Sequence, residues 1–89
     1  MEELFKVETT SHYSYVYKLK VPNYSDYKVR FDFSKSKDKN TRVFIFNNFQ
    51  WNLIIEERYY INNNVPLDEN QTKRKIQEYS DKFYKLVCL

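Results

Sequence analysis

The residues best suited to nucleophilic or acid–base chemistry are few in this sequence. The chain contains one His, His12, which stands between Ser11 and Ser14, and one Cys, Cys88. A serine nucleophile needs a base, a third group that orients this base, and donors that stabilise an oxyanion. The segment around His12 offers neither an orienting group nor the glycine-built loop that usually supplies such donors. We therefore predict that His12 is a solvated turn residue and that the protein is not an enzyme.

Carboxylates, cysteines and glycines also argue against a catalytic or cofactor site. Glu56 and Glu57 are adjacent, and neighbouring side chains of a strand point to opposite faces, so they cannot act as a paired acid and base. A single Cys excludes an intrachain disulfide and every multi-cysteine metal site. The chain has no Gly, which excludes the usual phosphate-binding loop and dinucleotide fingerprint. The sequence thus predicts no catalytic residues, no metal and no cofactor.

Basic residues beside an aromatic side chain form the first feature suited to binding. The formal net charge is +3, and the excess lies in the middle of the chain and in its last segment. The candidate residues are Tyr24, Lys28, Arg30, Lys35, Lys37 and Lys39. Cations beside an aromatic ring suit a nucleic-acid backbone with a stacked base. Lysines on an outward strand face also solubilise a sheet, however, and Asp26, Asp32 and Asp38 interrupt the patch, so we favour ordinary surface.

Alternating apolar residues predict the strands that position these side chains. Strands are expected at about 3–9, 12–21, 26–34, 42–47 and 49–59. In the clearest one, Tyr13, Tyr15, Tyr17, Leu19 and Val21 share one face, and in the next Tyr27, Val29, Phe31 and Phe33 do so. Aromatic residues at a spacing of two also suit a stacking platform for bases, but Leu19 continues the same face. We therefore expect these residues to be core.

The segment from Arg42 to Tyr60 is expected to form the central hairpin. Asn47 and Asn48 separate two β-rich runs, and Asn tolerates the positive φ that a two-residue hairpin turn requires. One face of this hairpin should form the centre of the core, and its residues are Phe44, Phe46, Phe49, Trp51, Leu53 and Ile55. Residues 49–60 would also suit a helix, but the alternation and the turn before them favour a strand.

A helix is expected over about 68–87. Asp68 is a suitable N-cap, and the apolar residues Ile76, Tyr79, Phe83 and Leu86 make one stripe. Together these elements predict an α+β fold in one compact domain, 1–89: a five-stranded antiparallel β-meander with one C-terminal α-helix packed on the aromatic face of the sheet. One helix covers one face only. The other face, with Val16, Val43, Ile45 and Ile54 among polar residues, must then be solvated or bound to a partner.

These features favour a small non-enzymatic inhibitor that binds a protein. We expect a phage or mobile-element accessory protein that occludes the functional surface of a host defence protein, for example one of the CRISPR type. The expected partner is a host protein or a protein–nucleic acid complex, with weak nucleic-acid contact possible. The alternatives are a module that binds single-stranded nucleic acid through the basic residues, and a small structural or self-assembling virion protein.

The cellular setting is predicted from two sequence features. The chain begins without a basic signal region and contains no apolar run of membrane-spanning length, so we expect no membrane association and a cytoplasmic location, in the host cell if the protein is viral. The edge strands leave two oligomeric states open, a monomer and a homodimer that pairs through these edges.

Overall fold

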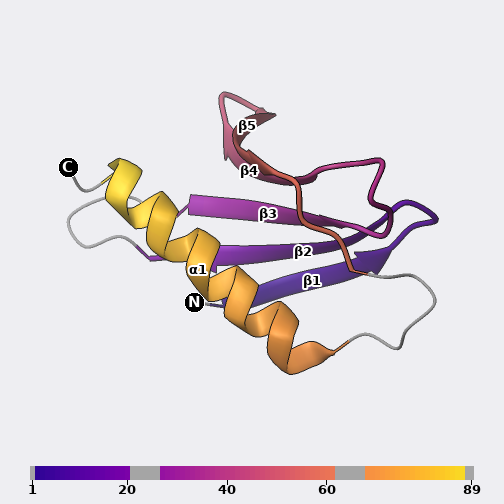
Figure 1. The fold of residues 1–89 in the computed structure, drawn as a ribbon. Helices are drawn as coiled ribbons and strands as arrows, with labels where there is room; N and C mark the ends of the chain where they lie inside the picture. The colour runs from indigo at the N-terminus through magenta and orange to yellow at the C-terminus, as the bar shows by residue number, and fades with distance from the viewer. Residues whose placement is uncertain (1, 21–26, 62–67, 88–89) are drawn as a thin grey trace.

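Five strands form one antiparallel sheet in sequential order, and a single helix lies across one face of it (Figure 1). The structure is a computed structural model that describes residues 2–20, 27–61 and 68–87. Its elements are β1 (Glu2–Glu8), β2 (His12–Leu19), β3 (Tyr27–Ser34), β4 (Thr41–Asn47), β5 (Gln50–Glu57) and α1 (Glu69–Val87). The predicted α+β meander with a C-terminal helix is confirmed, and so is the strand, rather than a helix, at β5.

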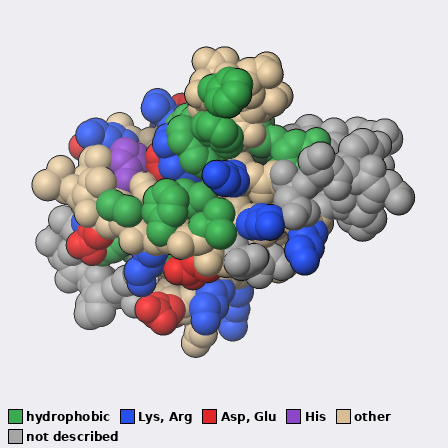
Figure 2. Space-filling view, turned by 180° about the vertical axis from the view of Figure 1, so that it is seen from behind, with side chains coloured by type: hydrophobic (Ala, Val, Ile, Leu, Met, Phe, Trp, Pro, Cys, Tyr) green, Lys and Arg blue, Asp and Glu red, His purple; other side chains and the backbone are tan. Residues whose placement is uncertain are grey.

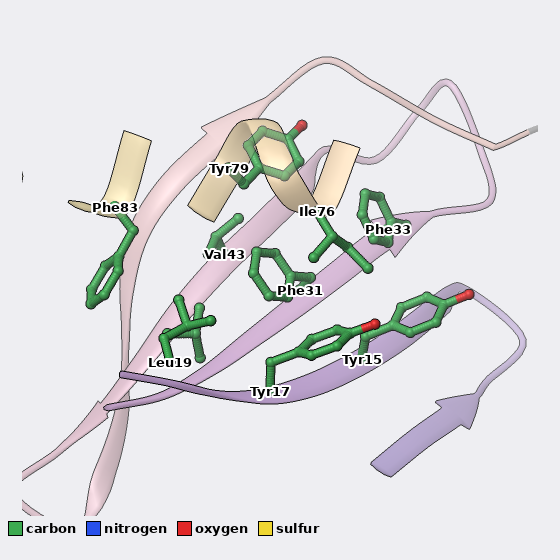
Figure 3. Packing of buried hydrophobic residues seen from close by; sticks show 10 residues of the cluster. Tyr15, Tyr17, Leu19, Phe31, Phe33, Val43, Ile76, Tyr79 and Phe83 are labelled. Carbon is green, nitrogen blue, oxygen red and sulfur yellow. The ribbon is translucent and has the colours of Figure 1, made fainter. Parts of the chain in front are cut away.

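The core lies between α1 and the facing side of the sheet (Figure 3). Its residues are Tyr15, Tyr17, Leu19, Val29, Phe31, Phe33, Val43, Ile76, Tyr79 and Phe83. Tyr15 meets Phe33, and Tyr17 meets Phe31, as edge-on rings with centroids 5.8 Å apart. Such aromatic pairs across neighbouring strands stabilise a sheet beyond the area that they bury. The predicted inward faces of β2 and β3 are thereby confirmed, except at Val21, which lies outside the described residues.

The helix begins as the sequence predicts. Asp68 Oδ1 accepts hydrogen bonds from the backbone N–H groups of Asn70 (3.0 Å) and Gln71 (3.2 Å), which is the geometry of an N-cap. Of the predicted stripe, Ile76, Tyr79 and Phe83 are buried. The side chain of Leu86 lies outside the described residues.

The prediction for the two faces of β4 is wrong. Val43 pairs with Phe31 and Ile45 pairs with Val29, so both lie on the helix side of the sheet, whereas Phe44 pairs with Arg30 on the other side. Both faces of β4 are apolar, and alternation alone does not distinguish them. The rings of β2, β3 and α1 already fill the core, and the smaller, β-branched side chains of β4 complete it.

The hairpin turn lies one residue later than predicted. Asn47 pairs with Gln50, and the two residues between them, Asn48 and Phe49, have φ values of 53° and 61°. Positive φ at both positions is the requirement of a type I′ turn. Phe49 is therefore a turn residue with a 97% exposed side chain and does not belong to the core.

A bulge in β5 corrects a further expectation. The register of β4 and β5 shifts between Val43 and Phe44, which leaves Ile54 without a direct partner. Ile54 and Ile55 both pack against the core, although only Ile55 was predicted there. Trp51 and Leu53 pair with Phe46 and Phe44 on the face away from the helix, so the predicted core centre at Trp51 is also wrong.

Candidate binding face

The side of the sheet opposite α1, here called the open face, is lined by three rows of side chains that run across the strands. The central row is Phe5, Val16, Arg30, Phe44 and Leu53, each directly paired with the next. Beside it, a row that is polar except at its first residue is Val7, Ser14, Asp32, Arg42 and Glu56. On the other side lie Lys18, Lys28, Phe46 and Trp51.

Apolar side chains of the open face are exposed to solvent. Figure 2 shows this face, with hydrophobic side chains gathered in two areas and Lys and Arg side chains between and beside them. Phe5 is 52% exposed and Leu53 is 49% exposed, and Phe46 and Val7 are also exposed. Val16, which lies between Phe5 and Arg30 in the central row, is fully buried. Exposed apolar side chains that gather on one face of a sheet are a common sign of an interaction site.

Arg30 is held at the centre of the open face by aromatic rings and a carboxylate. Its guanidinium carbon lies 4.2 Å from the ring centroid of Phe44 and 5.1 Å from that of Trp51. Its Nε lies 3.2 Å from Asp32 Oδ1, and Asp32 Oδ1 also accepts a 2.8 Å hydrogen bond from the Ser14 hydroxyl. Stacking and ion pairing together fix the planar cation, which is a residue type favoured at interfaces.

A second cation lies beside the aromatic end of the β4–β5 hairpin. Lys28 Nζ lies 5.6 Å from the centroid of the Phe46 ring, and Phe46 meets Trp51 edge-on at 5.2 Å. The Lys28 residue is exposed. This end of the open face therefore combines apolar rings with positive charge.

The sequence-predicted binding residues do not all come together. Lys28 and Arg30 share the open face, whereas Val16, on the same side of the sheet, is fully buried and cannot contact a partner. Val43, Ile45 and Ile54 pack in or against the core, so they leave the candidate surface. The loop residues Lys37 and Lys39 are exposed, and Tyr24 lies outside the described residues.

Lys35 has a structural role in the described structure. Its Nζ donates to the carbonyl oxygen of Thr9 (2.6 Å), lies 3.4 Å from Glu8 Oε2 and 4.5 Å from the Tyr13 ring centroid. Only 8% of its side chain is exposed. Lys35 thus ties the β3–β4 loop to the turn between β1 and β2 and is poorly placed to bind a partner.

The sequence reasoning missed several residues of the candidate surface, most of which it assigned to the core face of the sheet. They are Phe5, Phe44, Phe46, Trp51 and Leu53 on the open face and Phe49 at the hairpin turn. One signal pointed to them: both faces of β4 are apolar, which requires that one apolar set faces away from the helix. Which of the two sets faces away from the helix depends on the register in which β4 pairs with β3. The sequence pattern does not specify this register.

Ser11 and His12 are the residues that the sequence analysis considered as a nucleophile and its base. Ser11 Oγ lies 2.7 Å from His12 Nδ1, and burial lowers the pKa of the His12 imidazole, with the charge of Asp32 acting in the opposite direction. The pair belongs to the β1–β2 turn, where Thr9 Oγ1 accepts from the backbone N–H of both residues. This network orders the turn. Within the described ranges, no three His, Cys, Asp or Glu side chains gather as ligands for a metal ion.

Glu57 connects the end of β5 to the helix on the core side. The Tyr79 hydroxyl donates to Glu57 Oε2 (3.1 Å), Lys82 Nζ contacts Oε1, and Lys75 Nζ lies 3.9 Å from Oε2. The hydrogen bond from Lys82 lowers the pKa of Glu57, whereas burial raises the pKa of Tyr79. These groups tie α1 to the end of β5 on the core side of the sheet.

Comparisons with protein-family models, with curated proteins and with solved structures found no match to this chain. In the part of the chain that the structure describes, no helix is both long and apolar enough to cross a membrane.

Proposed function

We propose that the protein is a non-enzymatic binding protein whose open face docks onto a partner protein. The observation that carries this proposal is the central row, which presents Phe5, Phe44 and Leu53 around a stacked Arg30. Aromatic residues and Arg are enriched at protein interfaces, and they supply most of the binding energy when they become buried.

Inhibition is the form of binding that we propose. A domain of 89 residues offers little beyond one covering surface, and a partner that is covered by this surface loses access to its other ligands there. The compositional bias of the chain, without Gly and rich in Asn, Lys, Tyr and Phe, supports an origin in a phage or mobile element with AT-rich DNA. A host defence protein, such as a CRISPR-type effector, is the partner that fits this origin.

Single-stranded nucleic acid is a second candidate partner, favoured by one observation. Lys28 and Arg30 lie against the rings of Phe46, Phe44 and Trp51 on an antiparallel sheet. Sheets that bind single strands use aromatic rings to stack bases and cations to neutralise phosphates. Asp32 and Glu56 on the same face weaken this candidate, because their charges repel phosphates.

Affinity capture from host lysate, with and without nuclease, tests the proposal. Leu53→Asp places a charge on the apolar row at a side chain that is already half exposed, so the fold should survive. Arg74→Gln makes the same one-unit change in net charge on the exposed helix surface. We expect a nuclease-resistant protein partner that the Arg74 variant retains and the Leu53 variant loses.

Two outcomes of this capture contradict the proposal. Recovery of nucleic acid without a nuclease-resistant protein would favour the second candidate. Equal recovery of the partner by the wild type and the Leu53 variant would show that the open face does not bind it.

A further inference from the structure

Phe49 occupies a position in the hairpin turn that is unfavourable for a large side chain. It is the second central residue of the type I′ turn, with φ of 61°, and its side chain is 97% exposed. Glycine is strongly preferred at this position because a Cβ atom destabilises positive φ. Asn and Asp tolerate this φ better than Phe does. The chain uses Asn at the turn residue before, so its lack of Gly does not account for Phe49.

Hydrogen bonds at the flanks of the turn order its backbone. The Asn52 amide donates hydrogen bonds to the backbone carbonyl oxygens of Asn47 (3.2 Å) and Gln50 (3.3 Å), on either side of the turn. Phe46 and Trp51, the next pair along the hairpin, pack their rings edge-on against each other. A side chain displayed on an ordered turn loses less conformational freedom when it binds.

We propose that Phe49 is an anchor residue that inserts into an apolar pocket of the partner protein, with carboxylates of that partner at the rim of the pocket. This inference rests on the proposed function and extends it to the hairpin tip. The carboxylates follow from charge complementarity, because the exposed Lys28 lies beside Phe46, and the Phe46–Trp51 pair adjoins the pair that closes the turn. An exposed aromatic residue in a strained backbone conformation destabilises the free protein. Burial of its ring in a partner provides binding energy that offsets this cost.

Phe49→Gly tests the anchor, because strain and binding predict opposite changes. Glycine relieves the strain of the turn, so the melting temperature should rise by a few degrees. The affinity for the protein partner recovered by the wild type should fall about tenfold or more. Phe49→Asn is the matched control for chain flexibility, since it removes the ring and introduces a residue that tolerates positive φ without the added backbone freedom of Gly. The affinity of the Phe49→Asn variant for this partner should fall as much as that of Phe49→Gly.

Photo-crosslinking locates the contact. With p-benzoylphenylalanine in place of Phe49, we expect a cross-link to one protein, at an apolar segment that adjoins Asp or Glu. The same probe in place of Arg74, on the exposed helix surface, should give no such product.

The outcomes separate this inference from the proposed function. If Leu53→Asp abolishes binding and Phe49→Gly does not, the anchor is refuted while the open face remains the interface. A lowered melting temperature in Phe49→Gly would show a structural role for the ring and also refute the anchor. A cross-link to nucleic acid alone, or no protein partner for the wild type, would overturn both.

Discussion

At the scale of single residues, Phe31 connects the sheet to the helix within the core. It is fully buried, meets Tyr17 edge-on at 5.8 Å and stacks on Tyr79 at 6.5 Å. Removing it should cost ~3 to 5 kcal/mol of unfolding free energy, because the sheet and helix cannot close the cavity. Trp51→Ala should cost clearly less, since Trp51 lies half-buried on the open face. Urea denaturation followed by circular dichroism measures both, and a larger loss for Trp51 would contradict the core described here.

Glu57 makes stability depend on pH. Its pKa in the folded protein is lowered, chiefly by the hydrogen bond from Lys82, so the unfolded chain binds more protons near its ordinary pKa of 4.5. The stabilisation is therefore present above this pH and is lost as the pH falls through the lowered pKa. Glu57→Gln should destabilise the protein at neutral pH and converge with the wild type in acid.

The control for this titration is Glu56→Gln, which removes the same charge from the other side of β5, where Glu56 pairs with Arg42. Thermal melts from neutral pH to about pH 3 would give the comparison. A constant gap between the wild type and Glu57→Gln over this range would show that the carboxylate charge does not stabilise the helix contact.

At the scale of elements, the start of α1 depends on its cap. Asp68→Ala removes the acceptor for two backbone N–H groups, so we expect a loss of ~0.5 to 2 kcal/mol in urea denaturation. Asp68→Asn keeps an acceptor oxygen and should lose much less. Equal losses in the two variants would indicate that charge near the helix end, not the hydrogen bonds, supplies the stabilisation.

The β4–β5 hairpin shows which local features a sequence specifies and which it does not. In β2 and β3, alternation identifies the inward face, because one face is mainly apolar and the other mainly polar. The helix is predictable from its N-cap residue and its apolar stripe. In β4 both faces are apolar, so the pattern was compatible with either orientation. The turn moved by one residue because Phe49 adopts a conformation that its type disfavours, which no propensity rule would select.

The candidate site could be predicted only in part for the same reason. The clear alternation of β2 and β3 assigns Lys28 and Arg30 to the open face, and Val16 to the same side of the sheet, where it is buried. The aromatic residues that give this face its character lie on β4 and β5, whose orientation depends on pairing across strands. Lys35 resembled the other loop lysines in sequence, but its ion pair with Glu8 brings together residues far apart along the chain.

At the scale of the whole molecule, the helix lies on one face and the strand order leaves β1 and β5 at the edges. Edge pairing into a homodimer stays a prediction.

The salt dependence of binding distinguishes the two classes of partner proposed for the open face. For a protein-binding face, an oligo-dT strand of about 20 nucleotides should bind only weakly at physiological salt. Fluorescence anisotropy would measure this, and tight binding that weakens steeply with salt would favour nucleic acid.

Trp51 reports on the open face directly, because it is the only Trp of the chain and lies in the aromatic end of this face. Labelling with 5-fluorotryptophan gives a single fluorine NMR signal, measured in the free protein and in a complex with the purified partner. We predict that the free signal is sensitive to a soluble paramagnetic agent, and that the partner shifts this signal and protects it. A partner that binds while the Trp51 signal keeps its position and its sensitivity would contradict the claim that the open face is the binding surface.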